Sequence, residues 1–331
     1  MRSIFLVTAA AALAFAAGAA ASSPEPELED APPCDYGDSN PRLPQAGDDR
    51  EALYGLMLGQ RLRRPDRERV AAALRARFPG AATEAFLAIQ FAPTEGTEGH
   101  REALEAVIAR HAAAQDPDLR REVARARHGL IAYHLNRHVG ARMEEGFSWI
   151  AEDWRETEHG RRWSAALDRF LADYRGQGPM FDEFIADVEM DAIFRDAAGM
   201  TPGDNTGDQR FLRDSDRARD FMRAGMRRMI ARYGDSRDER VRLAVARATD
   251  MLAPYEAGPS ARIPIQRDII ARYKDAFDHA LRAEVGGAYH SLEGLLRDTG
   301  DAAGAEAVRL ERLAYEAARL DSVDCAPLTG R

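Results

Sequence analysis

The stretch IARHAAAQDPDLRREVARARHGLIAY, residues 108–133, returns 122 residues later as IARYGDSRDERVRLAVARATDMLAPY, residues 230–255. Eleven of the 26 aligned positions are identical, and the longest identical run sets Val-Ala-Arg-Ala at 123–126 against the same four residues at 245–248. A shorter match begins at Ile270, so three segments fit the pattern I-A-R-[HY]-x4-D-x3-R-x2-V. Such a recurrence is typical of chains that stack repeated units of secondary structure.

The repeated segment predicts the end of one helix followed by the start of the next. Its apolar residues recur at i, i+4, i+7 and i+11, on one face of a helix. They are Leu119, Val123, Ala126 and Leu130 in the first copy and Val241, Val245, Ala248 and Leu252 in the second. Asp116 is suited to cap a helix in the first copy. The third copy contains no helix breaker, so we expect it to lie inside one helix. Chance similarity between helices rich in alanine and arginine is the alternative explanation.

The N-terminus has the features of a secretory signal peptide. Arg2 precedes an apolar stretch at 4–17, and three alanines at 19–21 precede the expected cleavage site. We therefore predict that residues 1–21 are removed and that the protein is exported, to the periplasm or to the outside of the cell. Without this segment we expect no stable membrane insertion. Residues 22–47 hold six prolines and six acidic residues and predict a disordered leader.

The charge balance argues against one class of partner. The chain has 46 basic and 55 acidic residues, a net charge of −9 at pH 7. Proteins that bind nucleic acid or anionic membrane surfaces need a basic surface to contact the phosphates. We therefore expect no nucleic-acid partner.

The two cysteines, Cys34 and Cys325, lie on either side of the predicted helical region. Disulfides form readily in exported proteins, so these residues predict a bond that joins the two ends of the chain. Two free thiols, or thiols that pair with another chain, remain the alternative.

The pattern between residues 48 and 322 is helical throughout, followed by a short tail at 323–331. The expected helices are 49–63, 66–78, 81–91, 98–114, 117–138, 142–158, 161–175, 179–197, 209–233, 236–252, 264–284, 287–297 and 302–320. We predict an all-α fold of stacked antiparallel helical hairpins, similar to an α-solenoid. The connection at 199–207 marks a boundary between two repeated halves, 48–198 and 208–322, in one interpretation.

The C-terminal hairpin at 287–320 resembles a tetratricopeptide unit. Tyr289 and Leu292 occupy that family's packing positions in the first helix, and Gly300-Asp301 resembles its turn. Glu293 departs from the pattern, because the family has a small residue there, and the second helix is about five residues longer than the family's. The resemblance implies helix-on-helix stacking and covers roughly a tenth of the chain.

One candidate metal site stands out. His134 and His138 are one helical turn apart and share the apolar face of their helix, as half of a zinc or copper site would. His159 follows Glu156 in an E-x-x-H pattern on the next predicted helix, but helical spacing places it away from that helix's apolar face. Packed histidines with hydrogen-bond partners are the alternative. Met222, Met226 and Met229 form a stripe that predicts core packing in preference to copper binding.

The sequence contains one acidic segment and one basic segment. The helix at 179–197 carries five acidic residues before its first base, and residues 210–247 hold twelve arginines against six acidic residues. These blocks either pair inside the fold or form solvated faces, of which the basic one is suited to a partner.

The functional expectation rests on architecture. No catalytic signature is present, so we expect a binding protein without a resident cofactor rather than an enzyme. Stacked hairpins leave a long surface for contacts, and we therefore predict a protein or peptide partner in the cell envelope. The alternative is a metal-binding protein or metal-dependent enzyme that uses His134 and His138.

Overall fold

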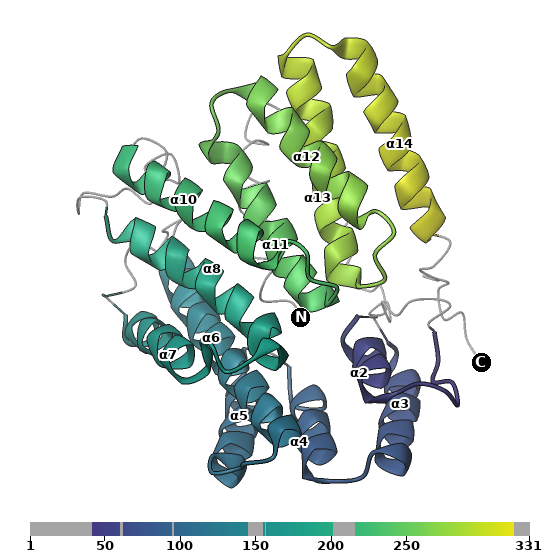
Figure 1. Cartoon of the computed structure of the whole chain (residues 1–331), viewed down its shortest axis with the longest axis vertical. Helices are drawn as coiled ribbons and strands as arrows, with labels where there is room; N and C mark the ends of the chain where they lie inside the picture. The colour runs from purple at the N-terminus through teal and green to yellow at the C-terminus, as the bar shows by residue number, and fades with distance from the viewer. Residues whose placement is uncertain are drawn as a thin grey trace.

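The computed structural model describes residues 42–59, 62–94, 96–144, 155, 157–200 and 216–320. These residues contain twelve α-helices and no strand, which confirms the all-α prediction (Figure 1). The helices are α2 (Arg50–Gly59), α3 (Arg64–Arg77), α4 (Ala81–Gln90), α5 (Glu98–His111), α6 (Pro117–Glu144), α7 (Glu158–Tyr174), α8 (Asp182–Ala198), α10 (Asp216–Tyr233), α11 (Glu239–Leu252), α12 (Pro259–Tyr273), α13 (His279–Asp298) and α14 (Ala302–Leu320). Two 3₁₀ turns, η1 (Pro179–Phe181) and η2 (Ala253–Tyr255), precede α8 and follow α11.

All three copies of the repeated segment form the same connection between two helices. They join α5 to α6, α10 to α11 and α12 to α13, each through five residues. In each, the aspartate of the pattern accepts a hydrogen bond from a backbone N–H in the first turn of the second helix. The distances are 2.9 Å for Asp116, 2.8 Å for Asp238 and 2.8 Å for Asp278. The repeated aspartate is therefore an N-cap, which satisfies amides that have no partner within the helix.

The third connection corrects the prediction of one helix over 264–284. The chain leaves α12 after Tyr273, and Asp278 starts α13. The Ala276 N–H donates to the Tyr273 carbonyl at 2.9 Å, just as Ala114 donates to His111 at 2.9 Å in the first copy. The capping aspartate ends the run without glycine or proline because it stabilises a new helix start.

Helix α6 also differs from its prediction, because it continues past residue 138 to Glu144. The expected break before 142 is therefore wrong, and a single glycine at 140 is tolerated inside the helix. Most of the helix predicted at 142–158 lies outside the described residues. The same holds for the predicted signal peptide, for the first part of the leader and for both cysteines.

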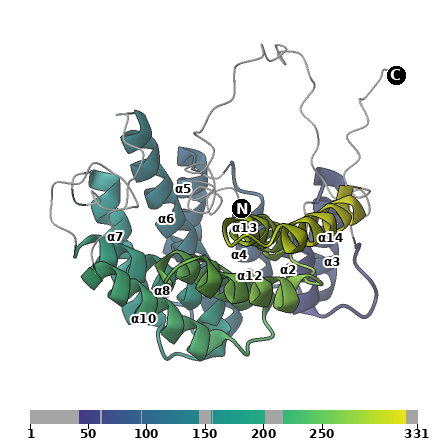
Figure 2. The ribbon, with the colours of Figure 1, turned by 90° about the horizontal axis from the view of Figure 1, so that it is seen from above.

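Neighbouring helices pack on one another, and five of them form a row. Helices α4, α6, α8, α11 and α13 each contact the next one in that order, and we call them the central row. Helices α5, α7, α10 and α12 each pack against central-row helices, and α14 packs on α13. Figure 1 shows this order as a curved succession of helices, and the view in Figure 2 shows α14 beside α13. The residues that the structure describes include no helix long and apolar enough to cross a membrane.

The apolar core is continuous along this row, because neighbouring clusters share a central-row helix. In α8, Phe184 and Ile185 pack with α6 and α7, whereas Ala186 and Met190 pack with α10 and α11. Helix α7 packs one apolar face into this core, since Trp163, Leu167, Phe170 and Tyr174 are at most 5% exposed. The methionine stripe of α10 is likewise core, with Met222, Met226 and Met229 at most 2% exposed.

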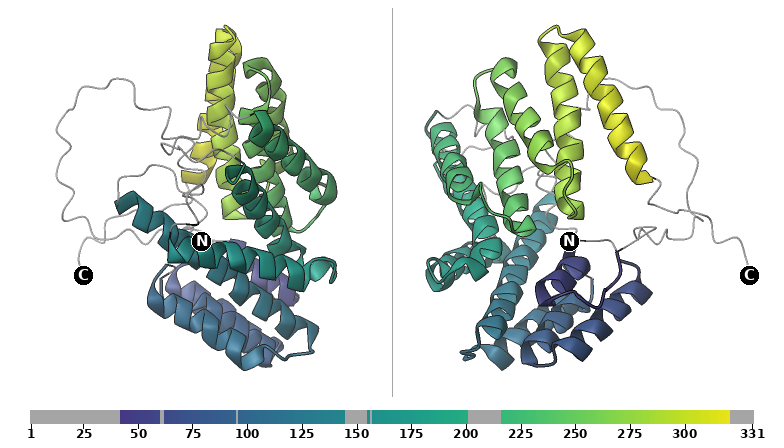
Figure 3. Two further views of the ribbon diagram at one scale, coloured as in Figure 1. Left: turned by 90° about the vertical axis from the view of Figure 1, so that its left-hand side faces the viewer. Right: turned by 45° about the vertical axis from the view of Figure 1, so that its right-hand side comes forward.

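Helix α2 connects the two ends of the row. Near its start Arg50 pairs with Asp118 of α6. At its end the Leu58 carbonyl accepts a hydrogen bond of 2.6 Å from the Arg240 guanidinium of α11. A Cβ on Gly59 would lie 3.5 Å from the Phe277 ring, before α13. Helix α2 therefore lies against the N-terminal ends of α6, α11 and α13, below the upper helices in Figure 1 and in the right-hand view of Figure 3.

The C-terminal hairpin matches the tetratricopeptide resemblance only in part. Tyr289 and Leu292 are buried, and Gly300 adopts the positive φ of 82° that the turn requires. However, α13 begins eight residues before the predicted 287. Glu293 is 5% exposed and accepts hydrogen bonds from Arg297 and Arg312. A buried, paired carboxylate thus replaces the small residue that the family has there.

Candidate functional site

The two histidines predicted as a half-site have different partners. The Nδ1 atom of His134 lies 3.1 Å from Nδ1 of His159 on α7. The Nδ1 atom of fully buried His138 lies 2.6 Å from the hydroxyl of Thr157, which also caps α7 by accepting the Gly160 N–H at 2.9 Å. Burial and then His159 lower the pKa of His134 to about 4, so this imidazole is neutral at neutral pH. A histidine from a second helix therefore does meet His134.

A complete metal centre is not formed by the part of the chain that the structure describes. Within it, no three His, Cys, Asp or Glu side chains are arranged to hold a metal ion. The contact between His134 and His159 fits either an N–H···N hydrogen bond or two adjacent metal ligands. Sequence analysis had placed His159 away from the apolar face of its helix.

The acidic helix α8 pairs with arginines from α6, α10 and α11 and with Arg175, which follows α7. Glu189 accepts hydrogen bonds from Arg175, after α7, at 3.0 Å and from Arg232 of α10 at 3.2 Å. On another face, Glu183, Asp187 and Asp191 follow one another at intervals of four residues and span about 80° of the helix. Of the two explanations for the opposite charge blocks, pairing inside the fold accounts for these contacts.

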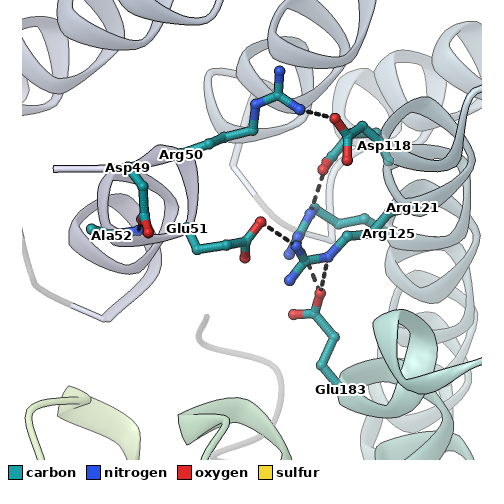
Figure 4. Close-up of polar contacts among 9 residues, drawn as sticks. Asp49, Arg50, Glu51, Ala52, Asp118, Arg121, Arg125 and Glu183 are labelled. Atoms are coloured by element: carbon teal, nitrogen blue, oxygen red, sulfur yellow. Dashed lines mark hydrogen bonds and ion pairs between the residues drawn. The ribbon is translucent and has the colours of Figure 1, made fainter.

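Glu183 belongs to a network next to α2, which we call the α2 network (Figure 4). Its members are Arg50, Glu51, Asp118, Arg121, Glu122, Arg125 and Glu183. Arg121 donates to Glu183 at 2.8 Å and to Glu51 at 2.6 Å. Arg125 donates to Glu122 at 2.9 Å and to Glu183 at 3.3 Å. Each buried carboxylate of this network therefore has at least one guanidinium partner.

Arg125 is held by rings as well as by carboxylates. Its guanidinium carbon lies 5.0 Å from the Phe184 ring centroid, 5.3 Å from that of Phe86 and 5.9 Å from that of Tyr54. Burial acts to raise the pKa of Glu183, but Arg125 and Arg121 outweigh it and hold that pKa below its ordinary value. Glu183 is thus ionised and fully compensated, as a structural ion pair must be when it is buried.

A second network lies farther along the central row, and we call it the Arg247 cluster. It consists of His128, Asp187, Asp191, Arg247, Asp250, Gln266 and Glu284. Arg247 of α11 donates through Nε to Glu284 of α13 at 3.2 Å. Its Nη1 atom is 3.8 Å from Asp187, which also lies 3.6 Å from His128 Nε2. Helices α6, α8, α11 and α13 each provide a member.

The Arg247 cluster has more negative than positive charge. Burial, reinforced by Asp187, raises the pKa of Asp191 to about 7, although Arg247 opposes the shift. Burial also raises the pKa of Asp250, whose hydrogen bond from Gln266 opposes it. Burial raises the pKa of Glu284 as well, against the effect of Arg247. Asp187, Asp191 and Glu284 therefore share the guanidinium of Arg247, whereas Asp250 is bound by Gln266.

Several polar atoms of the Arg247 cluster lack a partner within the described part of the chain. Arg247 and Gln266 are only 5% and 2% exposed, yet Arg247 Nη1 and Gln266 Oε1 make no hydrogen bond there. Asp187 Oδ1 likewise makes no hydrogen bond among the described residues. Buried polar groups of native proteins are nearly always satisfied, so such a group needs a water or a ligand to complete it.

Sequence analysis did not single out this cluster, although it contained a signal. Arg125 and Arg247 occupy the same position of the repeated segment, within the identical Val-Ala-Arg-Ala run. An arginine between residues of a buried stripe is unusual, because arginine is rarely buried without a partner. The two equivalent arginines are the centres of the two networks.

Comparisons of the chain with protein-family models, with curated proteins and with solved structures found no match.

Proposed function

We propose that this chain is an exported, solenoid-like helical protein that binds a protein or peptide partner in the cell envelope, and that the Arg247 cluster receives a lysine or arginine side chain of that partner. The observation that carries the proposal is the gathering of Asp187, Asp191 and Glu284 around the single guanidinium of Arg247, with Asp250 near Glu284.

The charge balance favours a cationic ligand. With all four carboxylates ionised and His128 neutral, the cluster has three more negative than positive charges. Buried charges are tolerated when opposite charges and hydrogen bonds compensate them. An ammonium or guanidinium group supplies that compensation, and its N–H groups match Asp187 Oδ1 and Gln266 Oε1, two acceptors without a hydrogen bond among the described residues.

The cluster is accessible enough to receive a side chain. The side chains of Asp187 and Glu284 are 18% and 11% exposed, whereas that of Glu183 is 5% exposed in the α2 network. Asp187 and Asp191 lie one and two turns beyond Glu183 along α8. A long, flexible lysine or arginine side chain can extend into such a partly buried position while its backbone stays at the surface.

Binding should release a proton. The charged groups that act on Asp191 are Asp187 on its own helix and Arg247 of α11. Asp187 also lies near His128 of α6, and Arg247 near Glu284 of α13. Because the pKa of Asp191 is about 7, an entering cation stabilises the ionised form and expels the proton. The affinity should therefore increase between about pH 6 and about pH 8.

The test uses the mature chain and acetyl-tetralysine amide as the probe, with acetyl-tetraglutamate amide for comparison, in isothermal titration calorimetry. We expect binding of the lysine peptide only, with an enthalpy that depends on the ionisation enthalpy of the buffer. In the variant Asp187→Asn/Asp191→Asn we expect affinity to fall by at least about tenfold.

The matched control is Glu102→Gln/Asp220→Asn, which removes two exposed carboxylates on α5 and α10. It changes the net charge equally and should alter the affinity by less than about twofold. Equal losses in both variants would mean that only the overall charge attracts the peptide, and the proposal would then fail.

A second candidate function is metal binding by His134 and His159, and the 3.1 Å between their Nδ1 atoms favours it. Two imidazole ligands of one tetrahedral zinc ion lie roughly that far apart. The test is the elemental content of protein that was exported through its own signal and purified without chelator or affinity tag. About one metal ion per chain, lost in His134→Ala and His159→Ala, would support this function. A metal-free wild-type protein would reject it.

A further inference from the structure

A groove lies on the side of α8 opposite to the Arg247 cluster. It has a volume of about 840 Å³ and is enclosed by α7, α8 and α10. The groove residues of α8 are Glu189, Ala192, Ile193, Arg195 and Asp196. Most of them project roughly 180° around the helix from Asp187, so the groove and the cluster occupy different faces.

The floor of the groove is apolar and its shape depends on one glycine. Ile193 and Phe221 contribute apolar surface, and the buried Met229 lies beneath them. A Cβ on Gly225 would lie only 2.7 Å from Ile193 Cγ2, so the missing side chain lets α10 approach α8 closely. The lining of α10 extends from Phe221 to Arg232, roughly 17 Å along the helix axis. A groove of this kind is suited to the apolar face of a helix.

The charge along the groove is uneven. At one end Arg175 and Arg232 share the single carboxylate of Glu189, and Arg228 of the same lining forms no ion pair among the described residues. At the other end the buried Arg195 binds Asp168 and Asp196, at 2.8 Å each. The first end therefore has two positive charges in excess, which an acidic partner would complement.

Helix α14 has the complementary surface. Leu310 and Leu313 are 54% and 42% exposed. The exposed alanines Ala303, Ala307, Ala314 and Ala317 lie within the same arc of the helix. Together they form an apolar stripe about 120° wide, which Glu306 interrupts and Glu311 borders. Glu306 and Glu316 pair with Arg309 and Arg312 of the same helix. Exposed apolar stripes on the last helix of a stack are unusual, because terminal helices normally have a polar outer face.

We propose that the groove receives α14 of a second copy of this chain, with Leu310 and Leu313 against the apolar residues of the groove and Glu311 next to Arg228. The two surfaces are both apolar at the centre, and neither Glu311 nor Arg228 forms an ion pair among the described residues. The stripe from Ala303 to Ala317 is roughly 21 Å long, similar to the length of the groove lining.

The geometry of this contact defines the assembly. Groove and helix are different surfaces, so the contact is head-to-tail and each added copy leaves another groove and another α14 free. It therefore produces chains or closed rings rather than a dimer with one shared twofold interface. One helix in one groove buries a small area, so we expect weak association that depends on protein concentration.

The experiment is sedimentation velocity of the full mature chain from about 1 µM to about 200 µM, with a reducing agent present so that cysteines do not join copies. Wild type should show a mean mass that increases with concentration. Leu310→Asp/Leu313→Asp should remain monomeric. Arg228→Glu and Glu311→Arg should each weaken association by about tenfold, because an attraction becomes a repulsion between partly solvated charges.

The combined variant Arg228→Glu/Glu311→Arg is decisive, because it restores opposite charges across the contact. We expect it to associate within about threefold of wild type. Arg64→Glu, which changes an exposed arginine on α3, is the matched control and should not affect the mass. Asp187→Asn/Asp191→Asn should also associate normally, which separates this proposal from the proposed peptide binding.

Two results would overturn the proposal. A wild-type chain that stays monomeric at every concentration would mean that a different protein, or another segment of this chain, covers α14. Association that is lost in Leu310→Asp/Leu313→Asp but is unchanged in Arg228→Glu would mean that α14 packs on another α14. Circular dichroism of each variant distinguishes lost association from lost folding.

Discussion

Arg125 and Arg247 are equivalent residues of the repeated segment, yet their surroundings differ. Arg125 has two carboxylate hydrogen bonds and lies against three aromatic rings. Arg247 has one carboxylate hydrogen bond, and its Nη1 atom remains unsatisfied among the described residues. The same residue in the same helical position therefore has more hydrogen bonds and ring contacts in the first copy than in the second.

The difference has its origin in what covers each arginine. Helix α2 places Tyr54 beside Arg125, and Glu51 helps to neutralise Arg121 next to it. In the Arg247 cluster, burial instead raises the pKa values of Asp191, Asp250 and Glu284. We infer that the α2 network stabilises the fold, whereas the Arg247 cluster is prepared for a partner.

The largest effect should come from Arg125→Met. It leaves Glu122 and Glu183 buried, at 1% and 6% exposure, without their shared guanidinium. Breaking a buried ion pair from one side costs about 3–5 kcal/mol, and we expect that loss in the free energy of unfolding measured by urea denaturation. Arg247→Met is the matched variant and should cost roughly half as much, because its carboxylates can take up protons instead. Equal losses would contradict the distinction between the two networks.

The next largest effect should be an increase in the free energy of unfolding of the Asp191→Asn variant at neutral pH. The folded state raises the pKa of Asp191 from 3.8 to about 7, so it retains a proton that the unfolded chain has lost. Stability contributed by this group is therefore complete below about pH 4 and declines as the pH rises to about 7. The shift corresponds to at most about 4 kcal/mol, and solvent access reduces it to about 2 kcal/mol.

The measurement for Asp191→Asn is the free energy of unfolding across that pH range. Wild type should lose stability relative to the variant as the pH rises, and the difference should vanish in acid. Glu183→Gln is the contrasting variant, because the pKa of Glu183 is lowered and its ion pairs are lost on substitution. It should destabilise at neutral pH. A destabilised Asp191→Asn would show that Asp191 is already compensated.

A smaller effect should follow from removing the bond between α11 and the end of α2. Arg240 donates to the Leu58 carbonyl at 2.6 Å, and hydrogen bonds from charged donors contribute about 1.5–3 kcal/mol. We expect Arg240→Ala to lower protection of the α2 amides from hydrogen exchange by about tenfold, while α7 amides keep theirs. Uniform loss over both helices would mean that α2 opens only with the whole fold.

Much of the fold could be predicted from the sequence, because caps and apolar spacing act locally. Asp116, which the sequence predicts as a cap, starts α6 through a bond from the Leu119 N–H, only three positions away. The break before α13 was missed because Asp278 ends the run without a glycine or proline, and breakers are the easier signal.

The candidate site was less predictable, because its contacts span the chain. Glu183 is 58 residues from Arg125, and Glu284 is 37 residues from Arg247. The spacing of residues within one helix does not predict which distant helix packs against it. His134 was predicted to share a face with His138, but its contact with His159 depends on how α6 and α7 cross.

The smallest effect tests the third copy of the repeated segment, in which Gly287 occupies the position of Arg125 and Arg247. This glycine is exposed in the middle of α13, and a Cβ there would meet no atom within 4 Å. Gly287→Ala should therefore stabilise the protein by about 0.5–1 kcal/mol through helix propensity alone, measured by urea denaturation. Gly225→Ala is the contrasting variant, because its Cβ collides with Ile193, and it should destabilise. A loss of stability in Gly287→Ala would mean that this position, like its two equivalents, is engaged in a contact. The expected gain in stability would instead show that the repeated helix start forms without an arginine at this position. The buried arginines of the other two copies would then be required for the two networks and not for the turn.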